Sequence, residues 1–205
     1  LPALEAAGYD RTLAQIPEPA TLAPAPLAAM GAAVTVDPHR GSIHLAPGAG
    51  LDLGAIAKGF TAELAADMLA PCGPCLVNAG GDIAMRGVPQ RGDWQVSVSL
   101  AGDDIALVGL LDGAMATSGR DKRRWHTAAG TIAHHVIDPA TAAPAQTDIL
   151  RITIFAATAV DAEINATALM LVGADAAIEQ AEGAGIDAIV VTEQGRCLMT
   201  RGLMQ

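Results

Sequence analysis

The chain has 205 residues, enough for one domain with a sizeable hydrophobic core or for two small lobes. Hydrophobic residues make up 51% of it but aromatic residues only 2%, so the core must be built mainly from alanine, valine, leucine and isoleucine. The net charge of −10 argues against nucleic acid as a partner, because phosphate binding needs a basic surface, but a bound metal ion would still allow a phosphorylated ligand.

In the first 45 residues the sequence predicts one short helix and one hairpin. Residues 1–30 are rich in alanine and proline and predict a short helix followed by irregular chain, since proline interrupts helices. Residues 33–36 and 42–45 predict two short strands. The turn sequence at residues 37–41 lies between them, which predicts a hairpin.

A helix is predicted after the glycine-rich stretch at residues 47–54. Apolar residues recur at every fourth position from Ile56 to Met68, which is typical of a helix, and Pro71 ends the pattern. A short strand at residues 76 and 77 follows. It leads into a turn with the sequence Asn-Ala-Gly-Gly-Asp.

The rest of the chain predicts three strands, then two helices, then two more strands. Residues 94–100 alternate apolar and polar side chains, as in a half-buried strand of an antiparallel sheet. Further strands are predicted at residues 105–111, 150–156, 189–191 and 197–199, and helices at residues 158–172 and 176–184. Hairpins with inserted helices predict an α+β fold with mainly antiparallel sheets. No apolar run is long enough to predict a membrane-spanning segment.

Cys72 and Cys75 have the CxxC spacing of a redox motif. Such a motif is expected in a thioredoxin-like βαβ setting, which the sequence does not indicate, and a zinc site would need a second ligand pair. We therefore interpret both as small core or loop residues.

Four polar clusters interrupt this apolar sequence, and we expect each at a turn or a helix end. The first runs from Asp52 to Gly59. A glycine-rich entry into a helix favours an anion, so Lys58 could contact a phosphate, although a capped helix with a surface lysine fits equally well. The second cluster, Asn78 to Asp82, is compatible with a ligand contact or with a capped glycine turn.

The other two clusters lie further along the chain. Ala116-Thr-Ser-Gly119 precedes a basic run at residues 120–124, which fits either a solvated loop or a ligand contact. In the fourth cluster, His134 and His135 are followed by Asp138 at a proline turn. A histidine beside an aspartate can serve as an oriented general base.

One predicted helix also carries two possible metal ligands. Glu163 and Thr167 are four residues apart and share one helix face. A carboxylate and a hydroxyl so placed are suitable oxygen ligands for Mg²⁺. Such polar pairs are also common on exposed helix faces, so the pair alone leaves both interpretations open.

Taken in order, these clusters resemble blocks of the FAD:protein FMN transferase (ApbE-type) family. Residues 52–60 resemble the block DLGGIAKGY, residues 76–83 resemble LVNLGGDI, and residues 116–119 resemble the start of ATSGDYR. Residues 135–144 resemble HIIDPRTGRP, and residues 162–169 resemble ADALATAL. One block alone would be a weak signal, but five in matching order and spacing are a strong one.

The resemblance implies an enzyme that transfers FMN from FAD to a threonine hydroxyl of a target flavoprotein, releases AMP and depends on Mg²⁺. FAD would be a substrate, and the acceptor flavoprotein would be the macromolecular partner. Two alternatives stay open: a Mg²⁺-dependent FAD pyrophosphatase, in which water replaces the threonine, and a non-catalytic flavin-binding domain. Release of AMP from FAD without an acceptor would distinguish them.

The resemblance also implies roles for single residues, by position. The backbone carbonyl of Ala55 and the side chains of Glu163 and Thr167 would bind the metal. His135 would act as general base near the transferred phosphate, oriented by Asp138. The residues that would bind FAD are Asp52, Lys58, Asn78, Gly80, Gly81, Asp82, Ser118 and Ile137, of which the last would line the flavin.

The sequence departs from the family pattern in several places. Glu163 stands where the family has aspartate, and Ala142 stands where it has glycine. Leu1-Pro-Ala-Leu4 resembles the end of a block, AFDPTVGPL, that lies well inside the family's domain. We therefore expect residues 1–205 to be a single C-terminal portion of that domain, and to bind FAD weakly when isolated.

Overall fold

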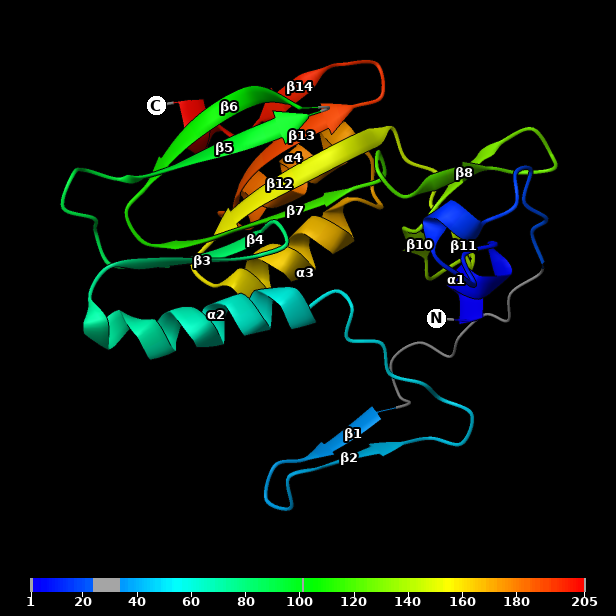
Figure 1. Ribbon diagram of the computed structural model, residues 1–205, viewed down its shortest axis with the longest axis horizontal. Coiled ribbons are helices and arrows are strands. Elements are labelled where there is room, and N and C mark those ends of the chain that lie inside the picture. Colours follow the sequence, from blue (N-terminus) through cyan, green and yellow to red (C-terminus); the bar gives the residue numbers. More distant parts are fainter. Residues whose placement is uncertain (1, 24–33, 101, 205) are drawn as a thin grey trace. The chain divides into compact units, whose positions relative to one another are not determined.

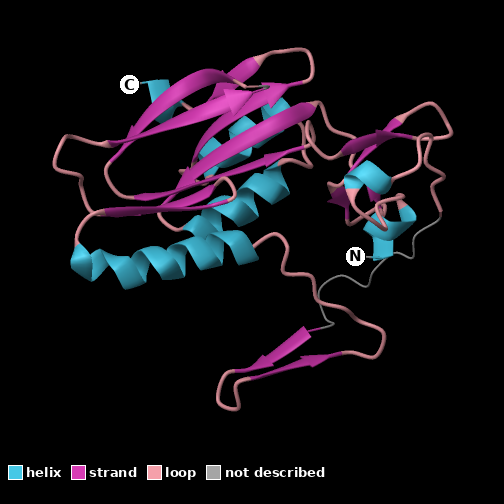
Figure 2. Ribbon diagram, viewed as in Figure 1, coloured by secondary structure: helices cyan, strands magenta, loops and turns pink. Residues whose placement is uncertain are grey.

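The computed structural model describes residues 2–23, 34–100 and 102–204 (Figure 1). The chain divides into two compact units. The small unit consists of residues 1–52 and 120–146, and the sheet unit consists of residues 53–119 and 147–205. The predicted α+β class with antiparallel sheets is confirmed (Figure 2).

The sheet unit is built on a six-stranded sheet in which every pair of neighbouring strands is antiparallel. The strand order is β14-β13-β12-β7-β4-β3. The strands are β3 (Cys75–Ala79), β4 (Asp82–Arg86), β7 (Gly113–Gly119), β12 (Ile149–Ala156), β13 (Asp187–Thr192) and β14 (Cys197–Met199).

One face of this sheet is covered by a hairpin of two strands, β5 (Trp94–Leu100) and β6 (Asp103–Leu110). Side chains alternate between the two faces of a strand, and those on the face toward the hairpin are large and apolar. They fill the space between the two layers. The buried members of this core are Ile83, Met85, Val96, Val98, Met115, Phe155 and Ile189. The predicted strand at residues 94–100 is thereby confirmed as a half-buried strand.

The other face carries helices α2 (Ala57–Leu69) and α3 (Ala159–Leu169), and α4 (Ala174–Gly183) packs against β13 (Figure 1). This second core is made of alanine: Ala62, Ala66, Ala84, Ala114 and Ala159 are all buried. Short side chains let the helix axes approach the sheet closely, so the chain needs few large residues on this face.

The apolar repeat that predicted α2 lies on the outer face of the helix. Phe60, Leu64 and Met68 are 59%, 51% and 74% exposed, whereas Ala62 and Ala66 are fully buried. The reason is steric, because the alanine face fits the shallow space above β4 and the bulky face does not. The repeat therefore indicated the helix correctly, but it does not mark the buried face.

Gly59 is the point of closest approach between α2 and α3. A Cβ atom there would overlap the carbonyl oxygen of Ala159 and would lie 3.1 Å from Oε2 of Glu163. The backbone N–H of Gly59 donates a hydrogen bond of 2.8 Å to the same Oε2. The glycine is thus required for packing.

The small unit has a core of its own around Trp125, which is 2% exposed. Its indole Nε1 donates to the carbonyl oxygen of Ala7 at 3.0 Å, and its ring lies 5.4 Å from that of Tyr9. The unit contains α1 (Pro2–Ala6), the 3₁₀ turn η1 (Leu13–Gln15) and three hairpins. These pair β1 (Val34–Asp37) with β2 (Ser42–Leu45), β8 (Arg124–His126) with β9 (Ile132–His134), and β10 (Ile137–Asp138) with β11 (Ala143–Pro144).

The predicted strands and helices elsewhere are found within a few residues of their expected ends, but several strands were not predicted. Ala116 to Gly119 was expected at a turn or helix end, but it lies in β7, a strand in the middle of the sheet. Strand β4 was not predicted either, nor were β8, β9, β10 and β11 of the small unit. On the face toward the helices, β4 and β7 carry alanine, Ala84 in β4 and Ala114 in β7, and alanine is depleted in strands, which weakens their strand signal.

Two further predictions concern residues outside the described ranges and the absence of a membrane-spanning segment. The predicted irregular chain at residues 24–30, and residue 33 of a predicted strand, fall outside the described residues. Within the ranges that the structure describes, no helix is both long and apolar enough to cross a membrane.

Replacing Gly59 with alanine is expected to lower the free energy of unfolding by about 1–3 kcal/mol, because the added methyl group must push α2 away from α3. Chemical denaturation of the two proteins measures this. The matched control is Gly183→Ala in α4, where a Cβ meets nothing within 4 Å; it should stabilise by up to about 1 kcal/mol. Equal effects of the two substitutions would contradict the packing argument.

Candidate functional site

The glycine turn at residues 78–82 forms the hairpin between β3 and β4. Gly80 and Gly81 are its two loop residues, and both have positive φ angles, 71° and 108°, as a tight hairpin turn requires. Oδ1 of Asn78 accepts a hydrogen bond of 2.8 Å from the N–H of Gly81. The turn therefore has a clear structural role: it places Asp82 at the start of β4.

Asp82 lies on the helix-facing side of the sheet, because it shares a face with Ala84 and alternates with Ile83. The residue is 1% exposed. Its Oδ2 makes an ion pair and hydrogen bond with Nζ of Lys58, which comes from the first turn of α2. The sequence suggested a ligand role for both residues, but not that they pair with each other.

Glu163 of α3 joins the same cluster. Its Oε2 is held by the N–H of Gly59, and its Oε1 lies 3.0 Å from Nζ of Lys58. That second contact is an ion pair without hydrogen-bond geometry, so among the described residues the buried Oε1 accepts no hydrogen bond. Three elements, α2, β4 and α3, thus bring two buried carboxylates to one ammonium group.

The cluster holds two acidic groups and one basic group. Burial raises the pKa of Asp82, and the neighbouring Glu163 carboxylate acts in the same direction against the effect of Lys58. Burial tends to lower the pKa of Lys58, but the two carboxylates outweigh it and raise that pKa. Lys58 therefore stays protonated at neutral pH, and one ammonium faces two carboxylates.

Thr167 and Ser118 lie next to this cluster in the fold. Thr167 follows Glu163 by one turn of α3, and its Oγ1 lies 3.4 Å from Oγ of Ser118 on β7. Ala55 lies in the turn immediately before α2. The sheet unit thus holds all three residues predicted to bind a metal.

The donor chemistry of these residues fits Mg²⁺, which prefers carboxylate, hydroxyl and carbonyl oxygens. The observation that supports the fit is the buried Oε1 of Glu163, which no N–H or O–H group of the described residues satisfies. No group of three or more His, Cys, Asp or Glu side chains gathers anywhere in the described ranges. A metal here would therefore also need backbone, hydroxyl, water or phosphate oxygens.

His135 belongs to the small unit, where it follows β9. Its backbone N–H donates to the carbonyl oxygen of Arg123 at 3.3 Å, while its ring Nδ1 is buried and has no hydrogen-bond partner among the described residues. Burial lowers its pKa, and the positive charge of Arg123 lowers it further. The imidazole is therefore neutral at pH 7. Nε2 of the adjacent His134 lies 3.1 Å from the Ala145 carbonyl oxygen, a structural contact.

The carboxylate of Asp138 closes the turn between β10 and β11. Oδ1 accepts a hydrogen bond of 2.8 Å from the N–H of Ala140, and Oδ2 accepts one of 3.2 Å from the hydroxyl of Thr141. Its predicted role in orienting His135 stays a prediction. Ile137 pairs with Pro144 in the same small hairpin.

The predicted site residues are therefore divided between the two units. Asp52, at the end of its segment, falls in the small unit with His135, Ile137 and Asp138. The sheet unit holds Ala55, Lys58, Asn78, Gly80, Gly81, Asp82, Ser118, Glu163 and Thr167. The structure brings Lys58, Asp82 and Glu163 into direct contact and places Ser118 beside Thr167.

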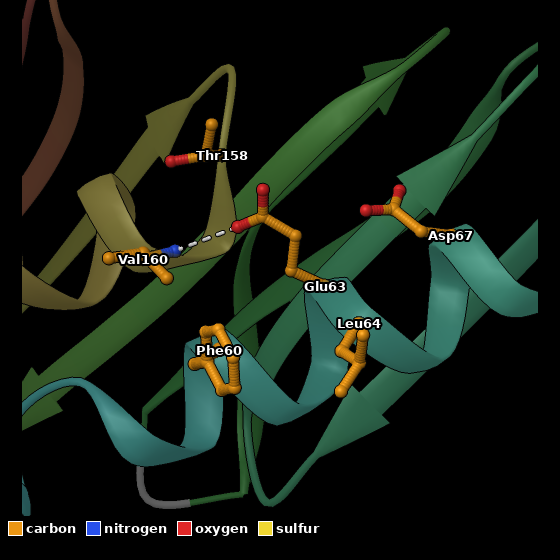
Figure 3. A pocket seen from close by; sticks show the side chains of 6 residues that line it. All are labelled: Phe60, Glu63, Leu64, Asp67, Thr158 and Val160. Carbon is orange, nitrogen blue, oxygen red and sulfur yellow. Dashed lines mark hydrogen bonds between the residues drawn. The ribbon is translucent and has the colours of Figure 1, made fainter. Parts of the chain in front are cut away.

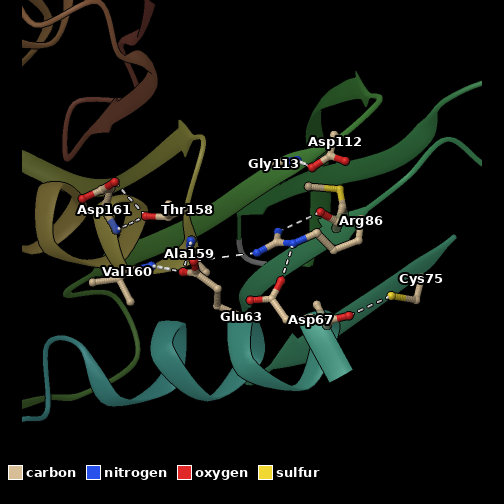
Figure 4. Close-up of polar contacts among 12 residues, drawn as sticks. Glu63, Asp67, Cys75, Arg86, Asp112, Gly113, Thr158, Ala159, Val160 and Asp161 are labelled. Carbon is tan, nitrogen blue, oxygen red and sulfur yellow. Dashed lines mark hydrogen bonds and ion pairs between the residues drawn. The ribbon is translucent and has the colours of Figure 1, made fainter. Parts of the chain in front are cut away.

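A shallow groove of about 180 Å³ lies elsewhere on the sheet unit, along the outer side of α2 and the start of α3 (Figure 3). None of the predicted site residues lines it. Its acidic residue Glu63 accepts hydrogen bonds from the N–H groups of Ala159 and Val160 (Figure 4). Arg86 forms ion pairs with Glu63 at 3.7 Å and Asp67 at 2.7 Å, so these polar groups tie α2 to α3 and β4.

Comparison with known proteins gives a consistent result. The model of the ApbE family matches residues 2–190. A FAD:protein FMN transferase of Treponema pallidum is 33% identical over 96% of this chain and 60% of its own length. One of Escherichia coli is 29% identical over 73% of this chain and 44% of its own length. The chain thus spans about half the length of the curated relatives it matches.

Solved structures agree with this. The ApbE protein of Thermotoga maritima superposes with a TM-score of 0.75 at 28% identity, covering 84% of this chain and 58% of that one. The flavin transferase ApbE of Vibrio cholerae superposes with a TM-score of 0.74 over 99% of this chain and 68% of that one. At 21% identity the latter match supports the fold alone.

Ala142 lies in the turn that follows Asp138 and has a φ angle of 54°; it is the single residue other than glycine with positive φ within the described ranges. This conformation costs an L-residue about 1–2 kcal/mol. Ala142→Gly is expected to raise the free energy of unfolding by about 0.5–1 kcal/mol, the gain being reduced by the greater entropy of glycine in the unfolded chain. Denaturant titration measures the change. Ala143→Gly in β11 serves as control and should destabilise; an equal loss in both would contradict the strain.

Proposed function

The chain belongs to the ApbE family, and from that membership we propose that it carries residues with which a FAD:protein FMN transferase moves FMN from FAD to a threonine hydroxyl. AMP would leave, and the reaction would require Mg²⁺. The acceptor would be a flavoprotein. The observation that carries the proposal is the cluster of Lys58, Asp82 and Glu163, in which a buried carboxylate oxygen accepts no hydrogen bond from the described residues.

Glu163, Thr167 and the Ala55 carbonyl would hold Mg²⁺ in the sheet unit. When bound, the ion would supply positive charge that neutralises the pyrophosphate of FAD and the charge that develops on the departing AMP. Lys58 and the start of α2 would add further positive potential for the phosphates, because a helix N-terminus favours anions. Asn78, Gly80, Gly81, Asp82 and Ser118 would complete the FAD-binding residues of this unit, together with Asp52 of the small unit.

His135 would act as the general base. Its lowered pKa keeps the ring neutral at pH 7, so it can accept the proton of the acceptor threonine. The threonine oxygen would then form a bond to the phosphorus of the FMN phosphate as the bond from that phosphorus to the AMP oxygen breaks, in line. The proton would reside on the His135 ring. In this scheme Asp138 would orient His135, and Ile137 would line the flavin.

The direct test is a flavin-transfer assay on the full-length protein with FAD, Mg²⁺ and an acceptor flavoprotein, read as covalent flavin fluorescence and AMP release. His135→Ala is expected to lower the rate by about 10²–10⁴-fold, the usual contribution of a general base. His126→Ala, an exposed histidine of the same unit, is the control and should retain activity.

Three outcomes would contradict the proposal. Full activity of His135→Ala would remove the proposed base. Fast AMP release without any acceptor would indicate hydrolysis of FAD in place of transfer. Flavin binding with no AMP release, even when acceptor is supplied, would indicate a non-catalytic flavin-binding domain.

The lowered pKa of His135 also predicts a pH dependence. Transfer needs the neutral ring, so kcat/KM should fall only as pH drops below the ordinary histidine value of about 6.5. The same shift makes the fold lose stability over that range, because the unfolded chain takes up the proton first. Arg123→Gln removes one cause of the shift and should raise the pKa of His135. The acidic limb of the kcat/KM profile should therefore move to higher pH. Two results would contradict His135 as the titrating base: an acidic limb of kcat/KM above pH 6.5 in the unaltered enzyme, or an acidic limb that does not move in Arg123→Gln.

A further inference from the structure

Lys58 differs from the two carboxylates it contacts in its freedom to move. Asp82 is fixed at the start of β4, and Glu163 is fixed by the hydrogen bond between its Oε2 and the N–H of Gly59. Both carboxylates are almost completely buried, whereas the Lys58 side chain is 49% exposed. A lysine on a flexible four-carbon stem can turn its ammonium toward solvent, while the two carboxylates are enclosed by the elements around them.

The contact to Glu163 is the weaker of the two that Lys58 makes. Lys58 donates a hydrogen bond to Asp82, but its approach to Glu163 Oε1 is an ion pair only. A buried carboxylate oxygen without a hydrogen-bond donor is costly, and a cation relieves that cost by charge alone. Oε1 is therefore the position in this cluster from which the ammonium is released at least cost.

We propose that Lys58 is a built-in counter-cation that neutralises Glu163 while no metal is bound, and that it competes with the divalent ion for Oε1 of Glu163. The inference rests on the proposed function, since it takes Glu163 as a metal ligand. When the ion binds, Lys58 gives up Oε1 and keeps its hydrogen bond to Asp82. Asp82 is then a positioning residue that retains the displaced ammonium beside the site.

This arrangement has two opposite consequences. Without metal, the ammonium stabilises the fold, because two buried carboxylates would otherwise have no counter-charge. With metal, the same ammonium weakens binding, since it must first be displaced and then remains as a nearby positive charge. Removing the charge of Lys58 should therefore lower stability and raise metal affinity at the same time, a combination that a purely structural salt bridge would not give.

The test is titration of the full-length protein with Mn²⁺ or Mg²⁺ alone, without FAD or acceptor, by calorimetry or by the electron paramagnetic resonance signal of free Mn²⁺. Lys58→Met is expected to bind the ion about 10- to 100-fold more tightly, the scale on which neighbours of metal ligands act. In thermal unfolding it should melt below the unaltered protein without metal and gain more from added metal. Lys58→Arg, which holds a carboxylate through two N–H groups, should bind the ion more weakly.

Arg86→Met is the matched control, because Arg86 also pairs with two carboxylates of the sheet unit and its removal changes the net charge equally. It should lower stability and leave metal affinity unchanged. The gain of Lys58→Met should disappear when it is combined with Glu163→Gln. Unchanged or weaker binding by Lys58→Met, or an equal gain in Arg86→Met, would overturn the proposal.

If Lys58→Met does not fold without metal, the Lys58→Arg titration still decides, because tighter or equal binding by that variant contradicts competition. The outcome is separate from that of the transfer assay. Competition for the metal without flavin transfer would refute the proposed function alone, and transfer without competition would refute this inference alone.

Discussion

Glu163 is a buried carboxylate on a helix that packs against a sheet, and it is tolerated because a backbone N–H points directly at it. That N–H belongs to Gly59, where α2 meets α3 too closely for any side chain. The close contact in turn depends on the alanine layer, because larger residues at Ala62, Ala66 or Ala159 would hold the helices away from the sheet. Packing of very small residues is thus what brings the polar cluster together.

The same cluster contains more acidic groups than basic groups. Asp82 and Glu163 bring two buried carboxyl groups together, and Lys58 supplies a single ammonium group. A sheet unit selected for stability alone would not need this cluster, because replacing a buried ion pair with apolar residues of similar volume is often neutral or stabilising. A cluster with more carboxyl groups than ammonium groups would suit the divalent ion and the phosphates proposed for this site, and this connects the fold of the unit to the proposed chemistry.

The two units carry different parts of that chemistry and are stabilised separately. The sheet unit has its hairpin core and its alanine core, and in the proposed function it would supply the oxygen ligands and the ammonium. The small unit is organised around Trp125 and supplies the histidine. His135 owes its lowered pKa to its burial there and to Arg123, so its protonation state is set within the small unit.

The sequence by itself determined the fold class and many of the helices and strands, and it suggested the residues of the proposed site. Alternating residues at 94–100 and the four-residue repeat of α2 depend on local periodicity, which is visible in one chain. The sequence did not reveal that the repeat of α2 faces outward, that Ala116 to Gly119 lies in β7, or that Lys58 pairs with Asp82 and Glu163. The two partners of Lys58 lie 24 and 105 positions away in the sequence. All three features depend on packing between distant parts of the chain, and only the tertiary structure decides which side chains share a buried space.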